Sequence, residues 1–208
     1  MTPTRFRPGK LVCVGRNYRE HAKELGNEVP KDPLIFLKPP SSVVWAGDAI
    51  ELPTASEKVD YEGEIGIVVG KRMRNVSEDV ASGGIRSVIA VNDVTARDLQ
   101  KSDGQWTRAK GFDTFCPLGE ESSTVPDLST LSVVTRVNGA VRQTGSTSEM
   151  VFSIPFLLAY ISRIMTLEPG DLVATGTPSG VGPLAPGDVV EVEIPGLSRV
   201  SNPVRGNR

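Results

Sequence analysis

Histidine is nearly absent from this sequence, with a single residue at position 21 in 208. Zinc and iron sites that take two or three imidazoles from one chain are therefore excluded. Cysteine is almost as rare, and Cys13 and Cys116 both stand among apolar residues. This pattern predicts buried, reduced thiols in a cytoplasmic protein, and neither a disulfide nor a nucleophile.

An excess of charge of one sign is also missing. The formal net charge is -2, which gives no support to binding of nucleic acid or of acidic lipid. No apolar run approaches the length of a membrane span, and the first residues lack the charged and then apolar plan of a signal peptide. We therefore expect a cytoplasmic protein that binds neither nucleic acid nor membranes.

Glycine and proline, in contrast, are abundant, with 21 Gly and 16 Pro and few long helical patterns. This composition predicts a mainly β protein with short helices, its strands joined by turns. The length suits one domain with a sizeable core. We expect a polar lead-in over residues 1–9 and a single domain over residues 10–208.

The hairpin formed by residues 131–137 and 140–144 is the clearest local prediction, because Asn138-Gly139 favours a two-residue turn. Residues 70–83 predict a hairpin or a short helix, residues 104–110 a loop, and the residues after 194 a polar tail. Short helices are expected at residues 16–26, 95–100 and 155–164. Strands are expected at residues 10–15, 34–38, 48–52, 60–70, 85–91, 171–175 and 188–194.

Two acidic residues, Glu62 and Glu64, stand two positions apart at the start of an apolar run. In an extended strand they share one face. Neighbouring carboxylates repel each other unless a cation compensates, and oxygen ligands suit Mg²⁺, Mn²⁺ or Ca²⁺. An edge strand with Glu on its solvent face would show the same pattern. Asp93 ends the next apolar strand, either as a cap or as a site residue.

His21 and Glu24 lie three residues apart on a predicted helix, within reach of each other. Such a pair can hold the imidazole in one tautomer and raise its basicity, as a general base requires. A lone histidine on a helix can equally be structural. Arg97 and Gln100 share a helical face in the same way, while Arg97 and Lys110 can also be solvated surface charges.

The segment 176–183 is rich in glycine and exposes backbone N–H groups that can grip an anionic oxygen. It lacks the Lys-Ser/Thr ending of a phosphate loop and the helix that follows one. Nucleotide binding is therefore rejected.

Together these residues form a set suited to metal-assisted chemistry on a 2-oxo acid. The sequence resembles the fumarylacetoacetate hydrolase family, most closely its short single-domain members related to acylpyruvases and to oxaloacetate decarboxylases or tautomerases. The resemblance covers nearly the whole chain. The matching stretches, in the family's order, are residues 14–18 with His21 and Glu24, then 36–39, 61–64, 92–100, 106–110 and 175–183.

The resemblance implies a mixed β-sandwich roll, a homodimer, and one Mg²⁺ or Mn²⁺ ion. The implied metal ligands are Glu62, Glu64 and Asp93. The implied catalytic residues are His21, Glu24 and Lys110, and the implied substrate-binding residues are Arg16, Arg97, Gln100, Gly176 and Thr177.

The implied activity is metal-dependent hydrolysis of a C–C bond in an acylpyruvate-type (2,4-dioxo acid) substrate, with oxaloacetate decarboxylation or tautomerisation supported by the same site. One alternative is an isomerase or decarboxylase of aromatic degradation that acts on 2-hydroxyhepta-2,4-diene-1,7-dioate or a related dicarboxylate. Another is a binding protein that keeps the fold without the chemistry. The connection from Gln100 to Lys110 is shorter than in several relatives, which leaves substrate choice open.

Overall fold

The computed structural model describes residues 7–24, 26 and 28–206 of the chain, so residues 1–6 of the expected lead-in lie outside the described residues. Its strands are β1 (Leu11–Gly15), β2 (Leu34–Lys38), β3 (Val43–Trp45), β4 (Ile50–Leu52), β5 (Val59–Tyr61), β6 (Gly63–Val69), β7 (Ile85–Asn92), β8 (Thr95–Ala96), β9 (Cys116–Leu118), β10 (Ser132–Val137), β11 (Ala140–Ser146), β12 (Leu172–Ala174), β13 (Gly182–Pro183), β14 (Val189–Ile194) and β15 (Ser198–Gly206). Its α-helices are α1 (Arg19–Glu24), α2 (Glu78–Ser82), α3 (Arg97–Asp103), α4 (Thr107–Lys110) and α5 (Ile154–Ile164), with 3₁₀ turns η1 (Pro40–Ser42) and η2 (Thr147–Glu149).

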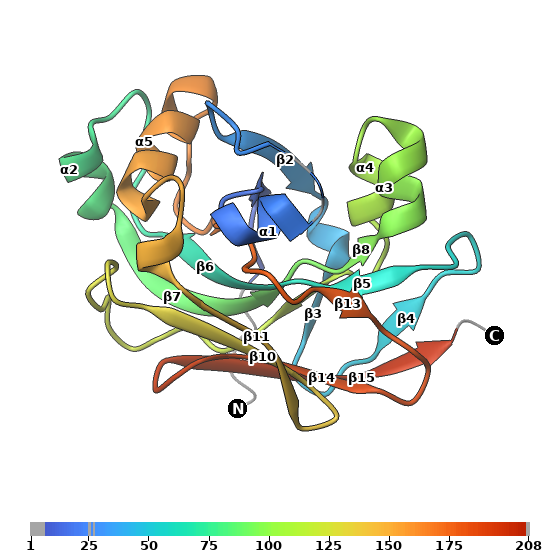
Figure 1. Cartoon of the computed structure of the whole chain (residues 1–208). Helices are drawn as coiled ribbons and strands as arrows, with labels where there is room; N and C mark the ends of the chain where they lie inside the picture. Colours follow the sequence, from blue (N-terminus) through green and yellow to red (C-terminus); the bar gives the residue numbers. More distant parts are fainter. Residues whose placement is uncertain (1–6, 25, 27, 207–208) are drawn as a thin grey trace.

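The strands form three sheets, which confirms the expected mainly β fold. The seven-stranded sheet has the order β2-β1-β12-β6-β7-β9-β3, and the five-stranded sheet has the order β11-β10-β14-β15-β4. The third sheet is small and has the order β13-β5-β8. In Figure 1 the five-stranded sheet lies at the bottom, and α1, α3, α4 and α5 lie on the opposite side of the molecule.

Two apolar layers follow from the alternation of side chains along the strands of the seven-stranded sheet. On β6, Ile65 and Ile67 pack in one cluster with α5 and with β10 and β14, whereas Val68 packs in another cluster with Cys13 and Cys116. Both thiols are free and buried, as expected. Because β6 lies between β12 and β7, it is a central strand. The alternative of an acidic edge strand is therefore wrong.

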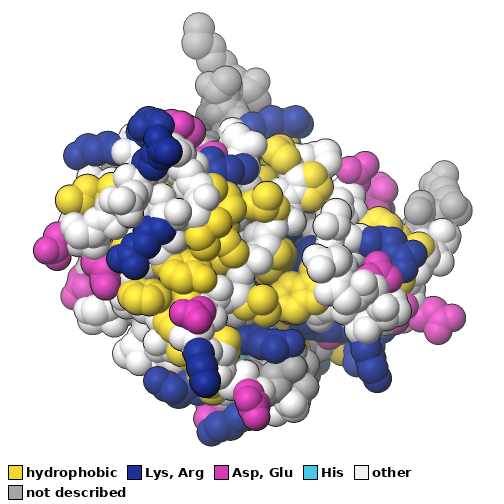
Figure 2. Space-filling view, turned by 90° about the horizontal axis from the view of Figure 1, so that it is seen from above, with side chains coloured by type: hydrophobic (Ala, Val, Ile, Leu, Met, Phe, Trp, Pro, Cys, Tyr) yellow, Lys and Arg dark blue, Asp and Glu magenta, His cyan; other side chains and the backbone are white. Residues whose placement is uncertain are grey.

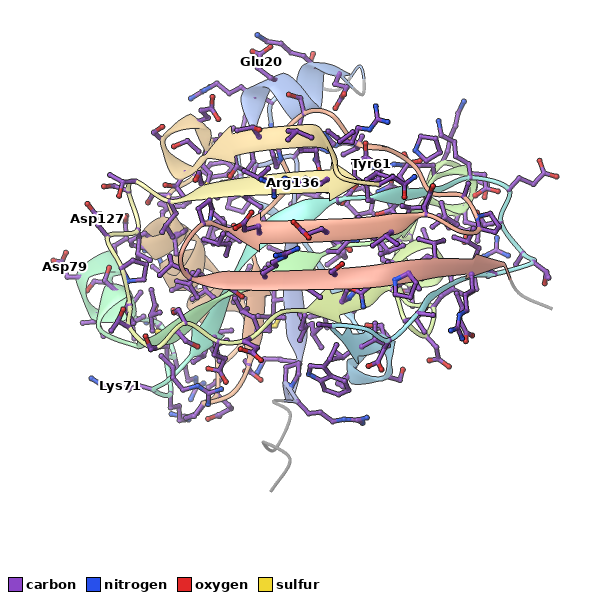
Figure 3. All side chains as sticks on the ribbon, turned by 90° about the horizontal axis from the view of Figure 1, so that it is seen from below. Glu20, Tyr61, Lys71, Asp79, Asp127 and Arg136 are labelled. Atoms are coloured by element: carbon purple, nitrogen blue, oxygen red, sulfur yellow. The ribbon has the colours of Figure 1, made fainter. Side chains whose placement is uncertain are left out.

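The outer face of the five-stranded sheet is polar and carries a network of ion pairs. Arg136 Nη1 lies 2.7 Å from Glu193 Oε2 and 3.2 Å from Glu191 Oε1, and Arg199 pairs with the same Glu191. Figure 3, seen from below, shows Arg136 on this face. One side of the sheet therefore faces solvent, and its other side covers the core.

The predicted hairpin is confirmed as β10 and β11, with positive φ at both Asn138 and Gly139. The predicted polar tail is wrong, because β15 pairs with β14 and β4 and buries Val200 and Val204. The predicted loop at 104–110 is also wrong, because it contains the helix α4.

Two further boundaries differ from the sequence prediction. The helix expected from residue 16 begins at Arg19, because Arg16 has a φ of 59° and the Asn17 side chain bonds to other segments. The strand expected over 60–70 is interrupted at Glu62, between β5 and β6. Among the described residues, no helix is long and apolar enough to cross a membrane.

Candidate metal and substrate site

Three buried carboxylates meet where β6 and β7 run side by side. Glu62 stands at the break before β6, Glu64 is on β6, and Asp93 directly follows β7. The Asp93 backbone N–H donates to the Glu62 carbonyl at 2.8 Å, and the Asn92 side chain accepts from the Glu62 N–H at 2.9 Å. One ligand oxygen from each of the three acids lies within 4.8 Å of the others. The strand pairing thus fixes the cluster that the sequence predicted.

Cations surround two of the three acids. Lys110 Nζ, on α4, lies 2.7 Å from Glu62 Oε2 and 2.6 Å from Asp93 Oδ2. Arg97 Nη2, at the start of α3, lies 2.5 Å from Glu62 Oε1. Neither cation is a solvated surface charge, because both side chains are at least nine-tenths buried.

Lys38 is a third cation at this cluster, and the sequence reasoning gave it no role. Its Nζ lies 2.6 Å from Asp93 Oδ1 and donates to the Val94 carbonyl at 3.1 Å. The side chain has no solvent exposure. The available signal in the sequence was the position of Lys38 at the end of the apolar strand β2. A lysine is almost never fully buried without a partner, so a lysine at such a position indicates a nearby acid.

The surroundings shift the pKa values of Glu62 and Glu64 in opposite directions. Burial raises the pKa of Glu62, but the charges of Arg97 and Lys110 outweigh this effect and hold the pKa well below its usual range. Burial raises the pKa of Glu64, and the negative charges of Asp93 and Glu62 raise it further. One Glu64 oxygen accepts the Gly176 N–H at 2.8 Å. Glu64 is therefore the acid for which a further cation would relieve the most repulsion.

The His21–Glu24 pair forms on α1 as the spacing predicts. His21 Nδ1 lies 3.3 Å from Glu24 Oε2, and the imidazole is buried. The Gly180 N–H donates to both oxygens of Glu24, at 3.0 and 3.2 Å. Burial lowers the pKa of His21, while Glu62 and Glu24 act in the opposite direction. The glycine-rich loop therefore holds Glu24, which in turn orients the imidazole.

The same loop is anchored to the acidic segment through Gln143, a second residue that the sequence reasoning missed. Gln143 Nε2 donates to Thr177 Oγ1 at 2.8 Å, and its Oε1 accepts the Gly63 N–H at 3.0 Å. Thr177 Oγ1 donates to the Gly63 carbonyl at 2.9 Å. Gln143 lies on β11, where the alternating pattern did not show that this one polar residue is buried.

A cavity of about 460 Å³ opens over the cluster. Its polar lining includes Glu62, Glu64, Asp93, His21, Arg16, Arg97, Gln100, Lys101, Lys110 and Thr177. Of the predicted site residues, Glu24 and Gly176 do not line the cavity; they act on His21 and Glu64 instead.

One wall of the cavity is apolar. Phe36 and Trp106 form it, with their rings edge to face at 5.2 Å. Seen from above, hydrophobic side chains also gather on the surface of this side of the molecule, with Lys and Arg around them (Figure 2). A ligand in the cavity thus meets charged groups and an apolar wall side by side, since Lys110 Nζ lies 5.0 Å from the centre of the Phe36 ring.

Arg97 and Gln100 are paired within the cavity wall. Arg97 donates from Nε to Asp60 Oδ2 at 2.8 Å and from Nη1 to Gln100 Oε1 at 2.9 Å. Because the Gln100 oxygen accepts from Arg97, its NH₂ group is the part that can donate to a ligand. Arg97 thus orients the amide of Gln100, while its guanidinium also contacts Asp60 and Glu62.

Comparison with known proteins agrees with this geometry. Residues 10–205 match the family model described as fumarylacetoacetate (FAA) hydrolase C-terminal. The chain belongs to the fumarylacetoacetate hydrolase family. The match spans almost the entire chain, including every residue of the acidic cluster.

Relatives within the fumarylacetoacetate hydrolase family include two mitochondrial proteins. The oxaloacetate tautomerase FAHD1 of Arabidopsis thaliana is 46% identical over 202 residues, covering 94% of this chain and 91% of the relative. The oxaloacetate decarboxylase of Dictyostelium discoideum is 45% identical over 195 residues, covering 90% and 89%. The crystal structure of 2-hydroxyhepta-2,4-diene-1,7-dioate isomerase from Mycobacterium marinum superposes with a TM-score of 0.89 at 46% identity, covering 97% and 76%.

The donor set of the cluster fits a hard divalent cation. All three groups are carboxylates, and they are buried within reach of one ion. Oxygen donors of this kind suit Mg²⁺ or Mn²⁺. The raised pKa of Glu64 shows that its charge is poorly compensated by the protein alone. A dication placed between the three acids would supply the missing compensation.

Proposed function

We propose that this protein is an enzyme dependent on Mg²⁺ or Mn²⁺ that acts on short 2-oxo acids through their enol or enolate form. The reactions that we propose first are the tautomerisation and the decarboxylation of oxaloacetate. One observation carries the proposal. Three buried carboxylates lie within 4.8 Å of one another on a cavity that also holds a lysine ammonium and a His–Glu pair. The oxaloacetate activities named for two relatives support the substrate.

Glu62, Glu64 and Asp93 would hold the ion. When bound, it would polarise the 2-oxo group of the substrate and stabilise negative charge on its oxygen. Lys110 adds to this stabilisation. Two of its three N–H bonds go to Glu62 and Asp93, so the third can donate to a substrate oxygen. The NH₂ group of Gln100 would bind a substrate carboxylate.

His21 supplies the proton transfer. Its Nδ1 faces Glu24, so Nε2 takes a proton from C3 of oxaloacetate and returns it to the 2-oxo oxygen, which completes tautomerisation. In decarboxylation the C3–C4 bond breaks, carbon dioxide leaves, and the electron pair forms the enolate of pyruvate. That bond cleavage needs no base. The two reactions therefore place different demands on His21.

Hydrolysis of an acylpyruvate is the second candidate function, and the His21–Glu24 pair favours it. His21 would take a proton from water as the water oxygen attacks the carbonyl distal to the carboxylate. The C–C bond between that carbonyl and C3 then breaks, and the enolate of pyruvate leaves with the electron pair. The apolar wall of Phe36 and Trp106 would contact the acyl group.

A substrate panel tests the proposal. Oxaloacetate, two acylpyruvates and a ring-cleavage dicarboxylate such as 2-hydroxyhepta-2,4-diene-1,7-dioate are assayed with Mg²⁺, with Mn²⁺ and with EDTA. We expect oxaloacetate turnover with either ion and a loss of at least a hundredfold in EDTA. Full activity in EDTA would refute the metal requirement. A preference for the dicarboxylate would move the assignment to the isomerase activity named for the structural neighbour.

A further inference from the structure

Lys38 stands behind the acidic cluster, on the side away from the cavity. It is the last residue of β2, and its backbone is paired with Leu11 of β1. Its ammonium contacts Asp93 Oδ1 and the Val94 carbonyl, and its side chain has no solvent exposure. Lys38 is not among the residues that line the cavity. It therefore acts on Asp93 and does not touch a substrate.

The two oxygens of Asp93 have different partners. Oδ1 lies 2.6 Å from Lys38, and Oδ2 lies 2.6 Å from Lys110, which lines the cavity. Glu62 is divided in a similar way, with Oε1 against Arg97 and Oε2 against Lys110. Asp93 and Glu62 thus each have one oxygen beside Lys110 and another beside a second cation. At Asp93 that second cation is fixed in the protein interior.

We propose that Lys38 restricts Asp93 to binding the metal through Oδ2 alone, and that it thereby favours a small six-coordinate ion such as Mg²⁺ over the larger Ca²⁺. The inference rests on the proposed metal site. Ca²⁺ takes six to eight oxygens and often both oxygens of one carboxylate, whereas Mg²⁺ requires near-octahedral geometry and retains water. The number of carboxylate oxygens that the site offers therefore affects which of the two ions binds more tightly.

Electrostatics explains why Lys38 has this effect. An ion that also bound Oδ1 would approach the buried Lys38 ammonium closely, and like charges repel strongly where water is excluded. Lys110 lies equally near Oδ2, but it lines the cavity, so its ammonium has space to turn toward a substrate oxygen when an ion binds there. The Lys38 ammonium cannot move aside easily, because Val94 holds it and the ring of Phe115 lies 6.0 Å away. With one oxygen from each acid, an octahedral ion keeps three positions for water and substrate. Lys38 thus affects both the choice of ion and the space left for the reaction.

Calorimetric titration of the full chain with MgCl₂ and with CaCl₂, without substrate, tests the proposal. The variant Lys38→Met removes the charge at nearly constant volume. We expect the ratio of Kd for Mg²⁺ to Kd for Ca²⁺ to rise at least tenfold in this variant. Lys10→Met is the matched control, because Lys10 pairs with the buried Asp171 away from the cavity. Its ratio should equal that of the wild type.

Each of the other titration results would contradict either the role of Lys38 or the metal site itself. An unchanged ratio in Lys38→Met overturns the proposal, and so does an equal tightening of both ions, since it would show an effect of charge alone. Failure of the wild type to bind either ion would instead overturn the metal site of the proposed function. If circular dichroism shows that Lys38→Met does not fold, Lys38→Gln enters the same titration, and an unchanged ratio there also overturns the proposal.

Discussion

At the scale of single residues, the site is an arrangement of buried charges that nearly cancel. Four carboxylates face three cations, so one negative charge is left over: the acids are Asp60, Glu62, Glu64 and Asp93, and the cations are Lys38, Arg97 and Lys110. Buried charges without partners are costly. The excess is concentrated at Glu64, which agrees with the raised pKa of that residue.

Replacing His21 by Ala separates the proposed reactions. Tautomerisation and acylpyruvate hydrolysis need a base, and we expect kcat for both to fall by roughly a hundredfold to ten-thousandfold. Decarboxylation of oxaloacetate breaks its C–C bond without a base, so its kcat should fall less than tenfold. Steady-state kinetics on the three substrates with Mg²⁺ measures the difference. An equal loss in all three reactions would refute the division of roles.

Replacing Glu24 by Gln should move the acid limb of the pH profile. His21 works as a base when neutral, so activity falls as the pH drops through its pKa, which burial holds below the usual 6.5. Glu24 counteracts burial through its hydrogen bond and its charge. Without that charge the pKa falls further, and the acid limb shifts to lower pH.

The measurement is kcat/KM for tautomerisation between about pH 4 and pH 8. Glu20→Gln is the control, because Glu20 lies on the same helix and pairs with the exposed Lys23 at 2.6 Å. Its profile should match the wild type. A limb that moves to higher pH in Glu24→Gln would contradict the assigned role of Glu24.

At the scale of elements, one buried asparagine joins three segments next to α1, the helix that carries His21. Asn17 Nδ2 donates to the Thr175 carbonyl at 2.9 Å and to the Phe152 carbonyl at 3.1 Å, and its Oδ1 accepts the Phe152 N–H at 2.9 Å. It thus ties the turn before α1 to the end of β12 and to the start of α5. The position of α1, and so of His21, depends on this connection.

The variant Asn17→Ala should lose about 2–4 kcal/mol of unfolding free energy, because buried backbone groups lose their partners. We also expect kcat/KM to fall about tenfold as α1 shifts. Asn202→Ala is the control, since Asn202 of β15 is buried away from the cavity and donates to the carbonyls of Trp45 at 2.7 Å and Asp48 at 2.9 Å. Urea unfolding should show a comparable loss with unchanged kinetics. Equal kinetic losses in both variants would show that Asn17 affects stability alone.

Elements with clear periodicity or turn chemistry could be predicted from the sequence, and those that depend on tertiary partners could not. The Asn138-Gly139 hairpin follows from local backbone preferences. The strand β15 does not, because its residues Val200 and Val204 alternate with polar ones among Gly, Pro and Arg, and only pairing with β14 makes the segment extended. The helix α4 has four residues, too few to show a period.

The acidic cluster could be predicted in part for the same reason. The spacing of Glu62 and Glu64 places them near each other in any extended chain, so two of the three proposed ligands were visible locally. Their meeting with Asp93 depends on the register of β6 and β7, in which Gly63 pairs with Asn92. The resemblance to a family supplied that pairing. Lys38 lies 55 residues from Asp93, and no local pattern joins them.

At the scale of the whole molecule, the sheets bring four distant regions to one cavity. The lining comes from residues 14–21, Phe36, residues 62–110 and Thr177. Burying the acids there costs stability unless a cation compensates. An ion that binds only the folded chain therefore stabilises the entire protein, and the effect grows with its concentration.

Thermal unfolding with and without Mg²⁺ measures this coupling. At about a hundred times Kd the ion adds roughly 2.7 kcal/mol, which corresponds to an increase in Tm of roughly 5–10 °C for a chain of this size. In Glu64→Gln the increase should be nearly abolished, because one charged ligand is gone. Metal-free Glu64→Gln should unfold at a higher temperature than the metal-free wild type, since the repulsion from Asp93 and Glu62 is relieved.

The pH dependence of the Tm difference between metal-free Glu64→Gln and the metal-free wild type is the control for this prediction. The pKa of Glu64 is raised in the folded state, so the folded chain binds the proton more tightly than the unfolded chain, and Glu64 destabilises the fold at pH values above the ordinary pKa of a glutamate. As the pH falls through the folded pKa toward the ordinary range of a glutamate, that penalty disappears. The Tm difference between metal-free Glu64→Gln and the wild type should therefore shrink as the pH falls. A difference that stays constant would show that the variant acts through packing and not through the charge that the metal compensates.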